Sequence, residues 1–151
     1  MPEERLVKAA EVSVFAHATE DEEKVKQAVQ RIARYEHAWE ARRLSGHYDD
    51  PIILLTSRTG KRREAVDLLA NIVGRLSSLD REALLSELPN RVDAQGSLYV
   101  RLDKQKAYHG RVVLNDNDPI RIKLRFQLPH KADPVLVVRE AIISMGEDDA
   151  E

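Results

Sequence analysis

Residues 97–126, SLYVRLDKQKAYHGRVVLNDNDPIRIKLRF, decide the fold of this chain. In their last seven positions apolar and cationic side chains alternate, and a period of two indicates a β-strand whose successive side chains leave opposite faces. The apolar positions are Ile120, Ile122, Leu124 and Phe126, and the cationic positions are Arg121, Lys123 and Arg125. We therefore expect one face of this strand to pack on a core and the other to carry three cations.

The whole stretch is expected to form three strands joined by two connections. The first strand presents Tyr99 and Arg101 on one face. The connection after it contains Lys104, Lys106, Tyr108 and His109, followed by Arg111. Asp103 stands where it can cap a short helical connection. Residues 115–118 form a turn by composition, and Pro119 follows at a strand start, where proline is tolerated.

The remaining sequence supplies further strands and helices. Alternation predicts a strand at 11–17, and the apolar run at 52–57 fits a central strand that is covered on both faces. Residues 35–45 fit either a helix continuation or a strand, and 46–51 reads as a turn. A first helix is predicted after a capping box formed by Thr19 and Glu22, and a second by the apolar spacing that follows Arg58–Arg63. A third helix is capped by Asp80 and stopped by Pro89. A last helix is expected over 135–145, ended by Gly146.

These elements predict a single α+β domain over 1–151. Consecutive strands with short links favour a largely antiparallel sheet, with the helices packed on one face and the other face open to solvent or a partner. The length of 151 residues is typical of one domain. The acidic tail at 147–151 is expected to be disordered.

Composition limits the classes of function. The chain has no cysteine, which excludes disulfides and thiolate metal sites, and no apolar run approaches the roughly 20 residues that cross a bilayer. The acidic N-terminus lacks an apolar signal core, so we expect a cytoplasmic protein. The net charge is −2, but residues 97–131 contain eight basic and three acidic residues. The chain is therefore electrically uneven, with one basic region.

A second group of cations lies at the expected start of a helix. Arg58, Lys61, Arg62 and Arg63 bracket Thr59–Gly60. Backbone N–H groups at a helix start, together with cations, can bind phosphate. The spacing does not match a Walker loop, because the upstream glycine and the following Ser or Thr are missing. The alternative interpretation is a solvated basic turn.

The sheet cations also have two interpretations. Arg121, Lys123 and Arg125 are adjacent like charges that could bind phosphates, or they could protect an edge strand from aggregation. Tyr99 and Tyr108 could stack on bases, or they could be ordinary half-buried strand aromatics.

The sequence offers little support for a metal site or a catalytic site. No pair among the five histidines has metal-ligand spacing. Asp116 and Asp118 resemble the start of a calcium loop, but the glycine and the distal glutamate are missing. Nothing converges on an acid–base pair. We expect no cofactor, no metal and no enzymatic activity.

Three stretches of the sequence are distinctive, and they are Val14–Glu22, Gly46–Ile52 and Leu98–Gly110. In this order they resemble an archaeal family of RNA-binding proteins linked to the exosome. The resemblance implies a fold like that of the large-subunit ribosomal protein that binds 5S rRNA, and RNA association without catalysis. It supplies no functional residues. The chain departs from the family by a longer segment, containing Trp39, between the first helix and Gly46.

The leading hypothesis is a non-catalytic RNA-binding protein that contacts structured RNA through a basic sheet face, with the exosome or the ribosome as its context. The candidate phosphate contacts are Arg58, Lys61, Arg62, Arg63, Arg101, Lys104, Lys106, Arg111, Arg121, Lys123 and Arg125, with Tyr99 and Tyr108 stacking on or positioning bases. The main alternative is a protein-interaction module or homodimer that uses the open sheet face or an edge strand. A nuclease is the third possibility.

Overall fold

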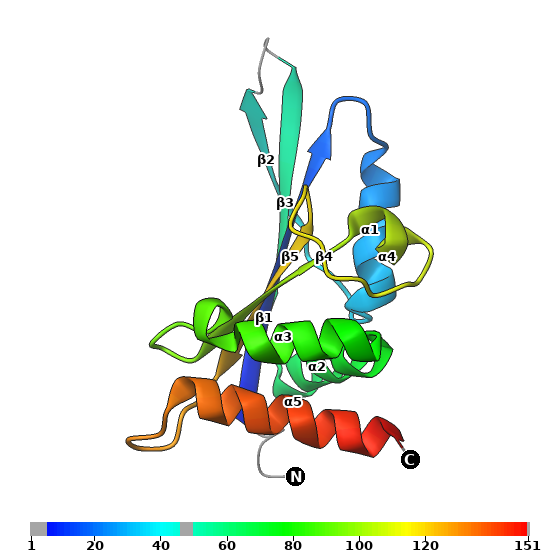
Figure 1. Ribbon diagram of the computed structural model, residues 1–151. Helices are drawn as coiled ribbons and strands as arrows, with labels where there is room; N and C mark the ends of the chain where they lie inside the picture. The colour runs from blue at the N-terminus through cyan, green and yellow to red at the C-terminus, as the bar shows by residue number, and fades with distance from the viewer. Residues whose placement is uncertain (1–5, 46–49, 151) are drawn as a thin grey trace.

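The structure, a computed structural model, describes residues 6–45 and 50–150, without the side chains of 147–150. One antiparallel sheet has the strand order β2-β3-β1-β5-β4, and the helices pack against one of its faces (Figure 1). The strands are β1 (Val7–His17), β2 (Glu40–Ser45), β3 (Pro51–Thr59), β4 (Ser97–Leu102) and β5 (Ile120–Phe126). The helices are α1 (Glu22–Ile32), α2 (Arg62–Arg75), α3 (Ser78–Arg91), α4 (Lys104–Tyr108) and α5 (Pro134–Ala150). The predicted α+β class and antiparallel sheet are confirmed.

The core lies between the inner sheet face and the helices. In β1, the central strand, Val12 and Val14 are fully buried, while the alternate residues Glu11 and Ser13 are partly exposed and face the side without helices. β5 repeats the pattern, with Ile122 and Leu124 turned inward. Because this alternation continues from strand to strand, one face of the sheet is apolar and covered while the other stays open. In the described part of the chain, no helix has the length and apolar character needed to cross a membrane.

Residues 97–126 contain two strands, so the prediction of three was wrong. The expected middle strand, at 111–114, forms only an isolated bridge between Leu114 and Leu102. Two backbone N–H groups of this segment have partners outside a strand ladder: that of Arg111 donates to the Lys106 carbonyl, and that of Leu114 donates to the Asp80 carboxylate. The predicted helical connection is confirmed as α4, whose N-cap Asp103 accepts a hydrogen bond from the Lys106 backbone N–H.

Several helix ends differ from the predicted ones. α1 is capped by Asp21 rather than Thr19, and α3 is capped by Ser77 rather than Asp80. Pro89 lies inside the last turn of α3 rather than stopping it, and α5 continues past Gly146 to Ala150. Each correction moves an end by a few residues, and at the two N-terminal ends a neighbouring polar residue serves as the cap. Glu151, the last residue of the predicted acidic tail, lies outside the described residues.

The open segment at 35–45 contains a strand, β2, which pairs with β3. The predicted turn at 46–51 falls largely on residues 46–49, outside the described part. The strand predicted at 52–57 is confirmed as β3, but β3 continues to Thr59, so Arg58 belongs to a strand and not to a helix start.

The two edges of the sheet differ. Beside β4, the chain adds bridges from Val92 to Leu98 and from Leu114 to Leu102, and the N–H of Asn115 donates to the Arg101 carbonyl. These contacts cover the outer edge of β4. β2, at the other edge, pairs only with β3 among the described residues.

Candidate nucleic-acid interface

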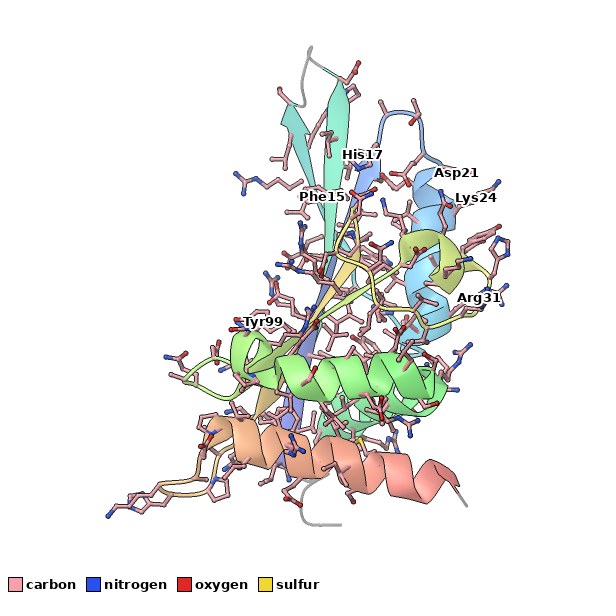
Figure 2. All side chains as sticks on the ribbon, in the orientation of Figure 1. Phe15, His17, Asp21, Lys24, Arg31 and Tyr99 are labelled. Atoms are coloured by element: carbon pink, nitrogen blue, oxygen red, sulfur yellow. The ribbon has the colours of Figure 1, made fainter. Side chains whose placement is uncertain are left out.

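The cations of β5 lie on the open face of the sheet, between β1 and β4. In register, Arg121 faces Arg101 of β4, Lys123 faces Tyr99, and Arg125 faces Ser97. Figure 2 shows Tyr99 and Phe15 on the side of the sheet away from α1, whose Lys24 and Arg31 extend on the other side. The register therefore places Tyr99, Arg101 and the three cations of β5 on one face of the sheet.

Like charges directly across a strand pair are unfavourable, and aromatic rings offset part of this cost here. The Arg121 guanidinium lies 5.2 Å from the centroid of the Phe15 ring, and the Lys123 ammonium lies 5.7 Å from the centroid of the Tyr99 ring. Arg101 approaches Asp116 at 3.8 Å. Within the described part of the chain, Arg121, Lys123 and Arg125 form no ion pair. Their charge is therefore available to an anionic ligand.

Tyr99 is held in place by a tight turn before β4. Its hydroxyl donates to Asp93 Oδ2 at 3.1 Å, and Asp93 Oδ1 accepts hydrogen bonds from the N–H groups of Gln95 and Ser97. The Ser97 hydrogen bond is the main cause that lowers the pKa of Asp93. Gly96 adopts a φ of +86° in this turn, where an added Cβ would lie 2.8 Å from Leu128 Cγ. The turn therefore fixes the Tyr99 ring while leaving 40% of the residue exposed.

A groove of about 690 Å³ runs over this face. Strands β1, β5 and β4 form its floor, and the last turn of α3 and the loop before β5 form its wall. The lining includes cations and carboxylates, which are Arg91, Arg101, Arg121, Lys123, Glu11, Glu87 and Asp116, together with Tyr99 and Asn90. Arg91 is bonded to Glu87 at 2.7 Å and approaches Asp116 at 3.5 Å, so it joins the wall to the loop.

The predicted basic turn divides into two parts. Arg58, on the open face of β3, pairs with Glu40 at 3.0 Å and Glu11 at 3.4 Å, and these carboxylates raise its pKa, Glu40 most. Its charge is therefore largely matched. Lys61, Arg62 and Arg63 are exposed at the start of α2. Arg62 reaches Gln127 Oε1 at 3.4 Å, which places its side chain beside the end of β5.

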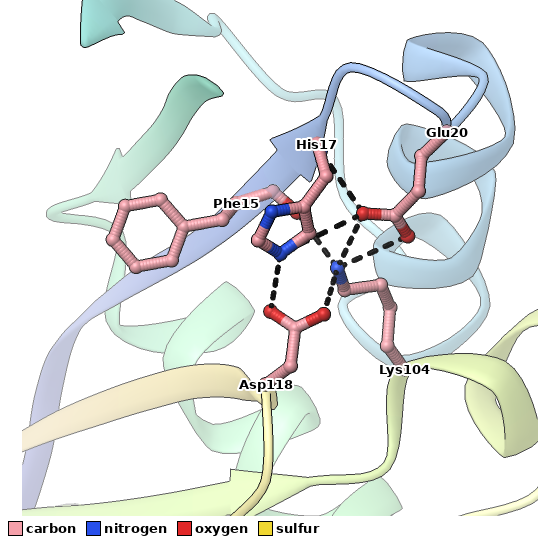
Figure 3. Close-up of polar contacts among 5 residues, drawn as sticks. All are labelled: Phe15, His17, Glu20, Lys104 and Asp118. Carbon is pink, nitrogen blue, oxygen red and sulfur yellow. Dashed lines mark hydrogen bonds and ion pairs between the residues drawn. The ribbon is translucent and has the colours of Figure 1, made fainter. Parts of the chain in front are cut away.

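Lys104 lies in the interior and not on an RNA-accessible surface. Only 8% of it is exposed, and its ammonium donates to the Phe15 carbonyl at 2.8 Å, to Asp118 at 2.9 Å and to both oxygens of Glu20 (Figure 3). His17 completes the cluster through Asp118 at 3.1 Å. Burial would raise the pKa of Asp118, but the hydrogen bonds from Lys104 and His17 outweigh it and lower that pKa. Lys104 therefore joins α4 to β1 and to the loop before β5.

Oxygen and nitrogen atoms of His17, Glu20 and Asp118 lie within 4.8 Å of one another, close enough to hold a metal ion. The Lys104 ammonium already bridges the two carboxylates, so the protein supplies its own cation there. The sequence did not reveal this cluster, because its hydrogen bonds join residues 84 and 101 positions apart.

Lys106, Tyr108 and Arg111 lie on or beside α4, which packs against α1 on the helical side of the sheet (Figure 1). The predicted site residues are thus not all brought together: one group occupies the open face and another the helical side. Sequence reasoning missed Phe15, Arg91 and Glu11 as members of the open face. Only the alternation at 11–17 carried a signal for Phe15 and Glu11.

The sequence and the fold of this chain both resemble those of known proteins. A sequence profile of a family described as RNA binding matches residues 9–126. The chain belongs to this RNA-binding family. It is 33% identical over 145 residues to the RNA-binding protein PAB1135 of Pyrococcus abyssi, covering 91% of this chain and 93% of that protein.

Solved structures agree with the fold. The crystal structure of protein AF2318 from Archaeglobus fulgidus, described as DUF54, is 33% identical with a TM-score of 0.72, over 95% of this chain and 99% of that one. The DUF54 protein Mth689 of Methanothermobacter thermautotrophicus is 26% identical with a TM-score of 0.76, over 92% and 97%. The predicted relationship to an archaeal RNA-binding family is therefore confirmed at the level of the family.

Proposed function

We propose that this protein binds structured RNA without catalysis, through the open face of its sheet. The observation that carries the proposal is the row of Arg121, Lys123 and Arg125 on β5, which forms no ion pair with a described residue and lies on the face without helices. Membership of an RNA-binding family and the relative named as an RNA-binding protein support it.

The proposed contact surface extends from the groove to the start of α2. Arg101 stands across from Arg121 at one end, and Arg62 lies beside the end of β5 at the other, with Lys61 and Arg63 next to it. Phosphate contacts of this kind fix affinity and orientation rather than sequence preference. Arg58 and Lys104 serve to position the sheet and α4, because carboxylates already hold their charges.

Two finer parts of the proposal concern context. We propose that the bound RNA belongs to ribosomal RNA or to an RNA processed by the exosome, and that the fold is like that of the ribosomal protein that binds 5S rRNA. Lys106, Tyr108 and Arg111 would then serve as a second, weaker contact on the helical side. Crosslinking in cells, followed by sequencing of the bound RNA, identifies the target directly.

Salt dependence tests the sheet-face proposal. For a stem-loop RNA, log Kd should rise linearly with log salt, and reversing Arg121, Lys123 and Arg125 to Glu should reduce that slope by about 2–3, since each lost phosphate contact contributes roughly 0.7–0.9. The matched control reverses Lys24, Arg31 and Arg139, exposed cations of α1 and α5 with the same change in charge. An equal loss of slope in both variants contradicts the proposed face.

The absence of catalysis has its own experiment. Labelled RNA incubated with the protein and Mg²⁺ should keep its full length. Shortened products that disappear with the triple Glu variant would replace the proposal with a nuclease that uses the same face.

A further inference from the structure

We infer that the groove over β1, β5 and β4 holds an unpaired nucleotide of the bound RNA, with its base stacked on Tyr99. This inference rests on the proposed RNA-binding function and specifies which part of the RNA the open face recognises. The phosphates of a double-stranded RNA would contact only the cations of the open face, and none of its bases would enter the groove.

The size of the groove favours a single nucleotide over a helix. Its volume of about 690 Å³ falls within the range of roughly 300–1,000 Å³ that small ligands occupy. The bases of a double-stranded RNA are stacked inside the helix, and its shallow minor groove is read by shape and by contacts to sugars and phosphates. A base can enter the groove only where it has been released from pairing.

The aromatic group is prepared for stacking. The Tyr99 ring lines the groove, and its hydroxyl is fixed by Asp93 at 3.1 Å, so little further ordering is needed when a base stacks. The Lys123 ammonium lies over one face of the Tyr99 ring, 5.7 Å from its centroid, so the base would stack on the other face of the ring. From this position Lys123, which lines the same groove, can hold the phosphate of the stacked nucleotide.

The carboxylates in the groove also favour a base. Glu11, Glu87 and Asp116 line it beside the cations. They would repel a phosphate that entered the floor, but a carboxylate has lone pairs left to accept hydrogen bonds from base N–H groups. Phosphates then lie at Arg121 and Lys123, while the base faces Tyr99 and the carboxylates. A uniformly basic groove would show no such preference.

The experiment compares a stem-loop RNA with a fully paired duplex of equal phosphate number. Because stacking on an aromatic side chain supplies about 1–3 kcal/mol per base, Tyr99→Ala should weaken stem-loop binding by about 5- to 150-fold and duplex binding by less than about two-fold. Tyr99→Phe, which keeps the ring and loses the Asp93 hydrogen bond, should stay within about three-fold of the wild type for both RNAs.

A second measurement does not depend on the variants. The loop carries 2-aminopurine in place of one unpaired base, and its fluorescence should fall when the wild-type protein stacks it. Salt-dependent binding by the wild type with no selective effect of Tyr99→Ala and no fluorescence change overturns the groove inference and leaves the proposed function standing. If the wild type shows no salt-dependent binding to either RNA, the proposed function fails as well.

Discussion

Lys104→Met tests the role of the buried ammonium. The substitution removes hydrogen bonds to the Phe15 carbonyl, Glu20 and Asp118, and leaves two carboxylates near each other without their cation. A hydrogen bond to a charged group contributes about 1.5–3 kcal/mol, and removing one partner of a fully buried pair costs about 3–5 kcal/mol. Both carboxylates are partly exposed, so water can solvate them again, and we expect a loss of about 2–3 kcal/mol in the free energy of unfolding.

Urea unfolding followed by circular dichroism measures this loss, and the melting temperature should fall by roughly 4–12 °C. Lys106→Met is the matched control, because Lys106 is exposed on the same short helix. A double-mutant cycle with Asp118→Asn should show coupling between the two positions. A loss below about 0.5 kcal/mol for Lys104→Met, or one equal to that of Lys106→Met, refutes the reasoning.

The same cluster predicts a response to acid. Because the pKa of Asp118 is lowered in the folded state from its ordinary value of 3.8, its contribution to stability is present above that value and is lost as the pH falls through the folded pKa. In Lys104→Met this part of the acid-induced loss of stability should shrink, as urea midpoints measured between pH 5 and pH 2.5 would show.

The remaining predictions concern three residues, which are His37, Tyr35 and Gly96. Burial lowers the pKa of His37 below 6.5 in the folded protein. The contribution of His37 to stability is therefore present above about pH 6.5 and is lost as the pH falls below that value. The melting temperatures of the wild type and of His37→Gln, measured from pH 7.5 to pH 5, should converge at the acid end. Tyr35→Phe removes a buried hydroxyl that has no hydrogen-bond partner among the described residues, so stability should stay equal or rise by up to about 1 kcal/mol in urea unfolding. Since burial raises the pKa of Tyr35 to about 12, stability of the wild type should fall as the pH rises from 10 to 12, and Tyr35→Phe should lose less. Gly96→Ala combines a positive φ with a close approach to Leu128, so it should cost about 1–3 kcal/mol, and unchanged stability would show that the turn tolerates a side chain.

Local pattern predicted much of the fold. The alternation in 120–126 and 11–17 predicted two strands, and the structure buries the apolar face of each, because burial of a half-covered strand follows its period of two. That these two strands are neighbours in the sheet was not predicted. The cap at Asp103 was predicted from its position before a short polar segment. The strand prediction for Arg111–Leu114 was wrong. The β-branched and apolar residues of this segment fit a strand, but the hydrogen-bond partners that replace a strand ladder lie in α4 and α3.

The candidate site was predicted less completely, since its charges depend on distant partners. Nothing near Arg58 or Lys104 in the sequence reveals that Glu40 and Glu20 hold them. Arg121 and Lys123 could be predicted, because both of their neighbours in β5 point inward and leave them on the open face. Sequence alone therefore distinguishes which cations face outward on a strand, but not which of them remain unpaired.

The covered outer edge of β4 limits how copies of this chain can associate by strand pairing. Extended fibres need two free strand edges on every molecule, one to receive a neighbour and one to offer the next. Here the bridges at Leu98 and Leu102 occupy one of them, and in the described sheet β2 alone remains. Pairing through β2 joins two molecules and then stops, because each has used its single free edge. A chain built this way can concentrate on RNA without growing into a fibre through its sheet.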